Sequence, residues 1–154
     1  MRKRTRSREF ALQVLYEIDV AGPALRDALQ DFWLDRSDLA LSHDEKEAVE
    51  QDKQEPEIRE YTERLTEGTL DKLSTIDPTI ERYAENWSMG RMACVDRNIL
   101  RLAVYEMLFV EEIPLKVAIN EAVELAKRYG EADSSKFVNG ILDRIAKTEC
   151  KDKT

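Results

Sequence analysis

The stretch from Cys94 to Ile145 decides the fold, and it reads CVDRNILRLAVYEMLFVEEIPLKVAINEAVELAKRYGEADSSKFVNGILDRI. Its first part, residues 95–110, is apolar on nearly every side, as is typical of a helix in the middle of a bundle. The second part, residues 114–129, starts with a proline suited to a first helical turn and places its apolar residues on one face. A third helix is expected from Asp133, a good N-cap residue, through Ile145. Three successive helices therefore predict a compact helical core.

Two glycines in this stretch carry further predictions. Gly130 follows Lys127 and Arg128, which complement the dipole in the last turn of the second helix, so a left-handed C-terminal cap is expected there. Gly140 lies inside the third helix, where a glycine suggests close packing against a neighbour.

The remaining chain also has helical spacing. One helix is expected to begin near residues 6–8 and to end at Gly22-Pro23, and a second to span residues 23–36. Residues 37–57 are acidic and poor in large apolar side chains, which predicts a mobile loop with a short helix around residues 44–49. Pro56 opens another helix, and Asp77-Pro78 predicts an N-cap followed by a first-turn proline.

These elements predict an all-α fold, a compact bundle of six or seven helices without a strand. We expect a single domain over residues 1–154 with two small subdomains, about 6–75 and 77–148, and a basic arm at residues 1–8. The arm is expected to be flexible or extended, because alternating arginines on a helix would point to opposite sides.

Composition agrees with a soluble helical protein, since 42% of residues are hydrophobic, 36% are charged, and there are only five Gly and four Pro. No window offers the ~20 apolar residues that a membrane span needs. The basic N-terminus is not followed by an apolar signal core, so a cytoplasmic location is expected.

Residues for catalysis or metal binding are sparse. Cys94 and Cys150 belong to no CxxC pair and are expected to be reduced thiols, and His43 is the chain's single histidine. The Glu111-Glu112 pair fits a solvated turn better than an acid/base dyad. We therefore expect no catalytic residue, no metal, no cofactor and no enzymatic activity.

Charge is distributed very unevenly along the chain. The net charge is −8, yet the first eight residues carry five positive charges and the rest holds 19 basic and 32 acidic residues, a balance of −13. Arginine suits phosphate because its planar fork makes bidentate contacts. The arm could neutralise about three to five phosphates, and the acidic body favours a narrow single strand over a duplex. A solvated basic terminus without a partner remains the open alternative.

Several motifs together resemble the NusB family of transcription antitermination factors. They are RSREFALQVLYEID at residues 6–19, VDRNILRLAVYEM at 95–107, IPLKVAINEAVELAKRYG at 113–130 and SSKFVNGILD at 134–143. The resemblance implies an all-helical fold of two subdomains. It also implies binding of boxA single-stranded RNA together with NusE, a small ribosomal subunit protein, in an elongation complex that makes RNA polymerase resist termination during ribosomal RNA synthesis.

The resemblance also assigns residues. By motif position the family's RNA contacts fall on Arg4, Arg6 and Arg8, with Arg2 and Lys3 as neighbouring candidates. Further RNA contacts fall at the start of the last helix, on Asp133, Lys136 and Phe137. Tyr16 and Asp96 match positions that face the protein partner.

Structural roles compete with these assignments. Phe137 shares its helical spacing with apolar core positions, Asp133 can serve as an N-cap, and Asp96 is a first-turn acid favoured by the helix dipole. At the level of the whole chain, a helical protein–protein module with an incidental basic arm is the main alternative. A third possibility is a relative of the NusB-like domain of ribosomal RNA methyltransferases, which the end of the chain at Thr154 disfavours.

Overall fold

The computed structural model describes residues 2–35 and 42–153. The described residues form eight α-helices and one short 3-10 helix, with no strand among them. The all-α prediction is confirmed, and the helix count exceeds the expected six or seven. By their contacts the residues form two compact units, 1–67 and 68–154. The assignment of residues 6–75 and 77–148 to subdomains stays a prediction.

The first unit contains α1 (Arg2–Ala21), α2 (Leu25–Leu34), α3 (His43–Gln54) and most of α4 (Pro56–Asp71). Its core is a cluster of apolar side chains from α1, α2 and α4: Phe10, Val14, Ala28, Leu29, Trp33 and Ile58. The rings of Phe10, Phe32 and Trp33 meet edge to face, with centroids 5.0–6.0 Å apart. Gly22 ends α1 with a φ of +78°, a left-handed conformation that glycine adopts without strain.

The expectation of an extended N-terminal arm is wrong, because α1 is helical from Arg2 onward. Positive charge at a helix N-terminus also opposes the helix dipole. Carboxylates at the end of α3 and the start of α4 offset it by pairing with Arg2, Lys3 and Arg6. The sequence predicted a helix start near residues 6–8 because the carboxylate partners lie about fifty residues away in the chain and leave no local signal.

The expectation of a mobile loop is also wrong for residues 43–54, which form α3. A capping box opens this helix, with the Ser42 hydroxyl accepting from Glu45 N and the Glu45 carboxylate accepting from Ser42 N. Near its end, Lys53 Nζ donates to the carbonyls of Phe32 and Asp35 at 2.8 and 3.0 Å. Residues 37–41 of the predicted loop lie outside the described residues.

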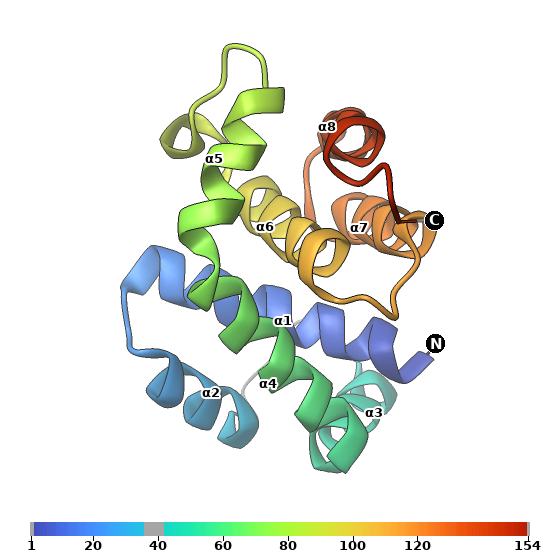
Figure 1. Cartoon of the computed structure of the whole chain (residues 1–154). Coiled ribbons are helices and arrows are strands. Elements are labelled where there is room, and N and C mark those ends of the chain that lie inside the picture. Colours follow the sequence, from blue (N-terminus) through green and yellow to red (C-terminus); the bar gives the residue numbers. More distant parts are fainter. Residues whose placement is uncertain (1, 36–41, 154) are drawn as a thin grey trace. The chain divides into compact units, whose positions relative to one another are not determined.

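The second unit contains the last turn of α4, then α5 (Leu73–Tyr83), the 3-10 helix η1 (Met89–Arg91), α6 (Cys94–Phe109), α7 (Leu115–Tyr129) and α8 (Ser134–Glu149). Helix α6 lies in the middle and packs against α5, α7 and α8 (Figure 1). Nine of its sixteen residues are buried. This confirms the helix in the middle of a bundle that the sequence predicted for residues 95–110.

Lys153 closes the C-terminal end of α6. Its Nζ donates to the carbonyls of Glu106, Met107 and Val110 at 2.9–3.1 Å. Carbonyls at a helix end have fewer backbone partners than those inside the helix, and a lysine there also complements the dipole. The residues after α8 thereby return to the helix on which the unit is built.

Two proline and glycine predictions fail for identifiable reasons. Helix α5 begins at Leu73, so Pro78 lies inside the helix and not in its first turn. Asp77 does not cap it: its carboxylate accepts a bidentate pair of bonds from Arg101, both 2.9 Å. Gly130 has a φ of −94°, which any residue adopts. A Cβ there would lie 2.6 Å from the Ser134 side chain, so close approach explains the glycine.

The prediction of close packing at Gly140 fails as well. A Cβ on Gly140 would meet no neighbour nearer than 3.8 Å, so no close packing requires this glycine.

Candidate nucleic-acid interface

The basic residues of α1 divide between different partners in the first unit. Arg2 and Arg6 both bind Asp52 of α3: Arg2 Nη2 lies 3.0 Å from Oδ1, and Arg6 Nε lies 2.7 Å from Oδ2. The Arg2 side chain is 69% exposed and that of Arg6 22%, whereas the Asp52 side chain is only 9% exposed. Arg6 Nη1 also lies 3.2 Å from Oε1 of the buried Glu9, so the more exposed Arg2 is the better placed of the two to approach an anion.

Replacing Asp52 with asparagine should lower the free energy of unfolding by about 1–2 kcal/mol, because an amide binds the two guanidinium groups less strongly than a buried carboxylate does. The matched control is Glu57→Gln. Glu57 pairs with Lys3 at 3.5 Å but its side chain is 74% exposed, so its loss should cost less than about 0.5 kcal/mol. Urea denaturation of both variants measures the difference, and equal destabilisation would contradict the special role of Asp52.

Lys3 and Arg4 face the start of α4. Lys3 Nζ lies 3.7 Å from Glu55 Oε1, and the Arg4 guanidinium lies over the Tyr61 ring, 4.4 Å from its centroid. Together with Arg64 of α4 these side chains border a small hollow of about 170 Å³. Arg64 and Tyr61 are residues of this surface that sequence reasoning did not assign to it, because no local motif marks them.

Arg8 does not share this exposed position. Its side chain is among the largest fully buried ones in the chain, with 1% of the residue exposed, and its guanidinium lies 5.9 Å from the Tyr61 centroid. Ser7 is buried too, with Oγ 2.9 Å from the carbonyl oxygen of Ile58. Both residues therefore pack α1 against α4, and the prediction of a direct RNA contact is not supported for Arg8.

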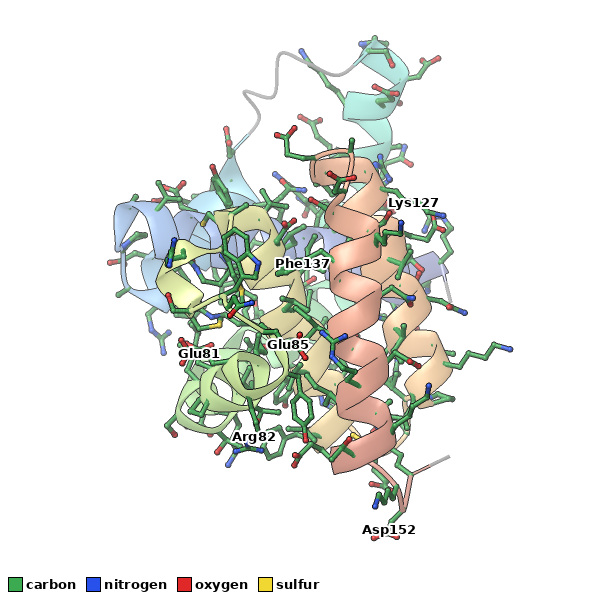
Figure 2. All side chains as sticks on the ribbon, turned by 90° about the horizontal axis from the view of Figure 1, so that it is seen from above. Glu81, Arg82, Glu85, Lys127, Phe137 and Asp152 are labelled. Atoms are coloured by element: carbon green, nitrogen blue, oxygen red, sulfur yellow. The ribbon has the colours of Figure 1, made fainter. Side chains whose placement is uncertain are left out.

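In the second unit, Asp133, Lys136 and Phe137 lie together at the start of α8. Asp133 occupies the N-cap position but its side chain makes no cap bond, and the Ser134 hydroxyl accepts from Glu131 N instead. Asp133 and Lys136 are exposed and Phe137 is half-buried. In Figure 2 Phe137 projects to the side of α8 on which Glu81 and Glu85 lie, away from Lys127.

The two residues predicted to face a protein partner lie in different units. Tyr16, on α1, is 41% exposed and so accessible to a partner. Asp96, in the first turn of α6, has a buried Oδ1 that accepts no hydrogen bond from any described residue. A buried acceptor without a donor costs free energy, but this oxygen is too deeply buried for a partner to reach, so it gives no support to a partner contact.

Residues 2–35 and 42–153 offer little support for a metal site, a reactive thiol or a membrane span. No group of three or more His, Cys, Asp or Glu in this part of the chain could hold a metal ion. Burial raises the pKa of the Cys150 thiol, which keeps it protonated and a poor nucleophile at neutral pH. None of the helices described is long and apolar enough to cross a membrane. Fold and surface together define an all-helical binding protein with a basic helix for an anionic partner.

The particular family follows from comparison with known proteins. The family model for NusB matches residues 5–147, and the chain belongs to the NusB family. The transcription antitermination protein NusB of Anaeromyxobacter sp. (strain Fw109-5) is 49% identical over 144 residues, covering 94% of this chain and 90% of its own. This confirms the resemblance seen in the sequence motifs.

Solved structures agree with the family assignment. T. maritima NusB superposes with a TM-score of 0.77 at 41% identity, covering 94% of this chain and 91% of its own. A crystal structure of antitermination factors NusB and NusE in complex with double-stranded RNA gives a TM-score of 0.74 at 28% identity, covering 96% of this chain and 98% of the matched one.

Proposed function

We propose that the chain is an RNA-binding adaptor of transcription antitermination. It binds boxA-type single-stranded RNA together with NusE and joins the elongation complex that makes RNA polymerase resist termination in ribosomal RNA transcription. It acts in the cytoplasm and catalyses no reaction. The observation that carries the proposal is the basic start of α1, where Arg2, Lys3, Arg4 and Arg6 keep exposed or half-exposed side chains.

Each residue has a role in this proposal. Arg2, Lys3, Arg4 and Arg6 neutralise phosphates, and Lys136 does so at α8. Phe137 offers its half-buried ring to a base. Asp133 lies beside the RNA, Tyr16 and Asp96 contact NusE, and Arg8 holds α1 in place.

The carboxylates around α1 set the strength of this surface. Asp52, Glu55 and Glu57 pair with the same cations that phosphates would bind, so RNA competes with intrachain ion pairs. Exposed pairs such as that of Lys3 are worth about 0–1 kcal/mol, which a phosphate can replace. A surface of this kind favours moderate affinity, to which a protein partner adds.

A salt series tests the function. Fluorescence anisotropy measures binding of a labelled boxA-type single strand, alone and with NusE, and compares it with a scrambled strand and with a duplex. Five phosphate contacts on a single strand predict a log–log salt slope of about −3.5. Binding that fails with and without NusE would refute the proposal and favour a helical protein–protein module, the alternative reading of the fold.

Asp133→Asn should tighten RNA binding about two- to threefold, because it removes a negative charge within several ångströms of phosphate. The matched control is Asp143→Asn, nearly three turns further along the same helix, where the carboxylate pairs with Lys147 at 2.9 Å. Both variants lose one negative charge, so anisotropy titrations separate a local effect from a change in net charge. Equal effects of the two variants would place Asp133 away from the RNA.

A further inference from the structure

Trp87 is an exposed aromatic residue to which the proposed function gives no role. It lies in the segment between α5 and α6, and 46% of its surface is accessible. Its ring meets Phe137 of α8 edge to face, with centroids 6.3 Å apart and an interplanar angle of 77°. A large aromatic side chain is costly to leave in water, and this one adjoins the residue proposed to receive a base.

The segment that carries Trp87 is fixed from both sides. Asn86 turns the chain with a φ of +66°, and Trp87 N donates to the Ala84 carbonyl at 3.0 Å. Met89 is buried, its N–H donates to Glu81 Oε2 at 2.8 Å, and its carbonyl accepts from Arg97 Nη1 at 2.8 Å. A ring displayed from such an anchored turn loses little conformational freedom on binding, which favours affinity.

The geometry of the ring pair suits a planar ligand. An edge-to-face pair makes a corner, in which a third ring stacks on one face while its edge meets the other ring. Bases of a single strand are free to enter such a corner, and every base has a π-face to stack on. Glu81 and Glu85 lie on the same side of α8 as Phe137 and carry negative charge, so the corner suits a base better than a phosphate (Figure 2).

We propose that Trp87 and Phe137 form one base-stacking site, in which a base of single-stranded RNA stacks on the Trp87 indole and meets the Phe137 ring. Lys136, beside Phe137 in α8, neutralises the adjoining phosphate. The inference rests on the proposed RNA binding and extends it to the turn between α5 and α6.

Tryptophan fluorescence tests the inference directly, since the chain has only two tryptophans. Trp33 is 6% exposed, its Nε1 donates to Glu63, and it is shielded from solvent and RNA. Titration with a boxA-type single strand should quench Trp87 and protect it from acrylamide. Trp87→Phe should abolish both the quenching and the protection. This assigns both signals to Trp87, and the assignment does not require the variant to lose RNA binding.

Affinity gives an independent measure. Trp87→Ala should weaken RNA binding about 5- to 100-fold, the range for losing one base–aromatic stack, while leaving the salt slope unchanged. Trp87→Phe should retain most of the affinity. Thermal melts of both variants verify that they fold. The fluorescence titration of the wild type tests the site even if a variant does not fold.

The outcomes separate this inference from the proposed function. RNA binding by anisotropy without any change in Trp87 fluorescence would overturn the stacking site and leave the function standing. Protection of Trp87 by NusE in the absence of RNA would also overturn it, by making this a protein contact. No RNA binding by the wild type, with or without NusE, would overturn both.

Discussion

Neutralising Arg2, Arg4 and Arg6 together with glutamine should lower affinity for single-stranded RNA about 100-fold at 0.1 M salt. Each phosphate contact on a single strand contributes about 0.7 to the slope of log affinity against log salt concentration. Losing three contacts therefore removes about two log units of the affinity that the wild type gains between 1 M and 0.1 M salt. The slope itself should flatten from about −3.5 to about −1.4. Anisotropy titrations between low and high salt measure both quantities.

Glutamine keeps a hydrogen-bond donor near Asp52, yet that carboxylate loses both charged partners and the fold needs checking by a thermal melt. The matched control replaces three exposed cations elsewhere with glutamine: Arg26, Arg128 and Lys151. It changes the net charge by the same amount. Equal loss of RNA affinity in the two triple variants would mean that net charge, and not contact by α1, attracts the RNA.

The choice of arginines shows what the motif resemblance could and could not supply. Sequence placed the RNA contacts on Arg4, Arg6 and Arg8 and treated Arg2 as a neighbour. The structure leaves Arg2 exposed and buries Arg8 against Tyr61, so the triple variant exchanges one for the other. Spacing along a helix predicts the face on which each residue lies. Which other element packs against that face depends on tertiary contacts.

The core was predictable because its signal is local. Residues 94–145 combine periodic apolar positions with proline and glycine punctuation, and the three helices lie where this pattern placed them. Helix α3 has a local signal in its capping box, but its acidic composition argued for disorder. Its order depends on Asp52 and Lys53, whose partners lie 46–50 and 18–21 residues away, and such pairings leave no local pattern.

The candidate site also has features that the local sequence predicts and features that depend on distant residues. Basic charge on α1 and the position of Phe137 could be predicted from sequence, since both depend on residues within one helix. The partners that tune them could not: Asp52 lies on α3, and Trp87 lies fifty residues before Phe137 in a turn shaped by Asn86. A positive φ at a non-glycine residue has no dependable sequence signature.

Gly68→Ala should lower the free energy of unfolding by about 2–3 kcal/mol, although alanine is the better helix former. A Cβ at Gly68 in α4 would lie 2.1 Å from Cζ and 2.5 Å from Cε1 of Tyr105. The Tyr105 ring cannot move aside easily, because the residue is 9% exposed and the ring stacks on Phe109 at 5.8 Å. Overpacking therefore exceeds the gain of about 1 kcal/mol in helix propensity.

Second-site variants test this explanation, with urea denaturation as the measurement. Tyr105→Phe should not rescue Gly68→Ala, because the ring carbons stay in place, whereas Tyr105→Leu should restore part of the loss through a favourable coupling. Gly140→Ala is the matched control: its nearest neighbour would be Arg144 Nη1 at 3.8 Å, so it should gain about 0.5–1 kcal/mol. A stabilising Gly68→Ala would show that the last turn of α4 and the Tyr105 ring separate without cost, and the close approach of Gly68 to Tyr105 would then be wrong.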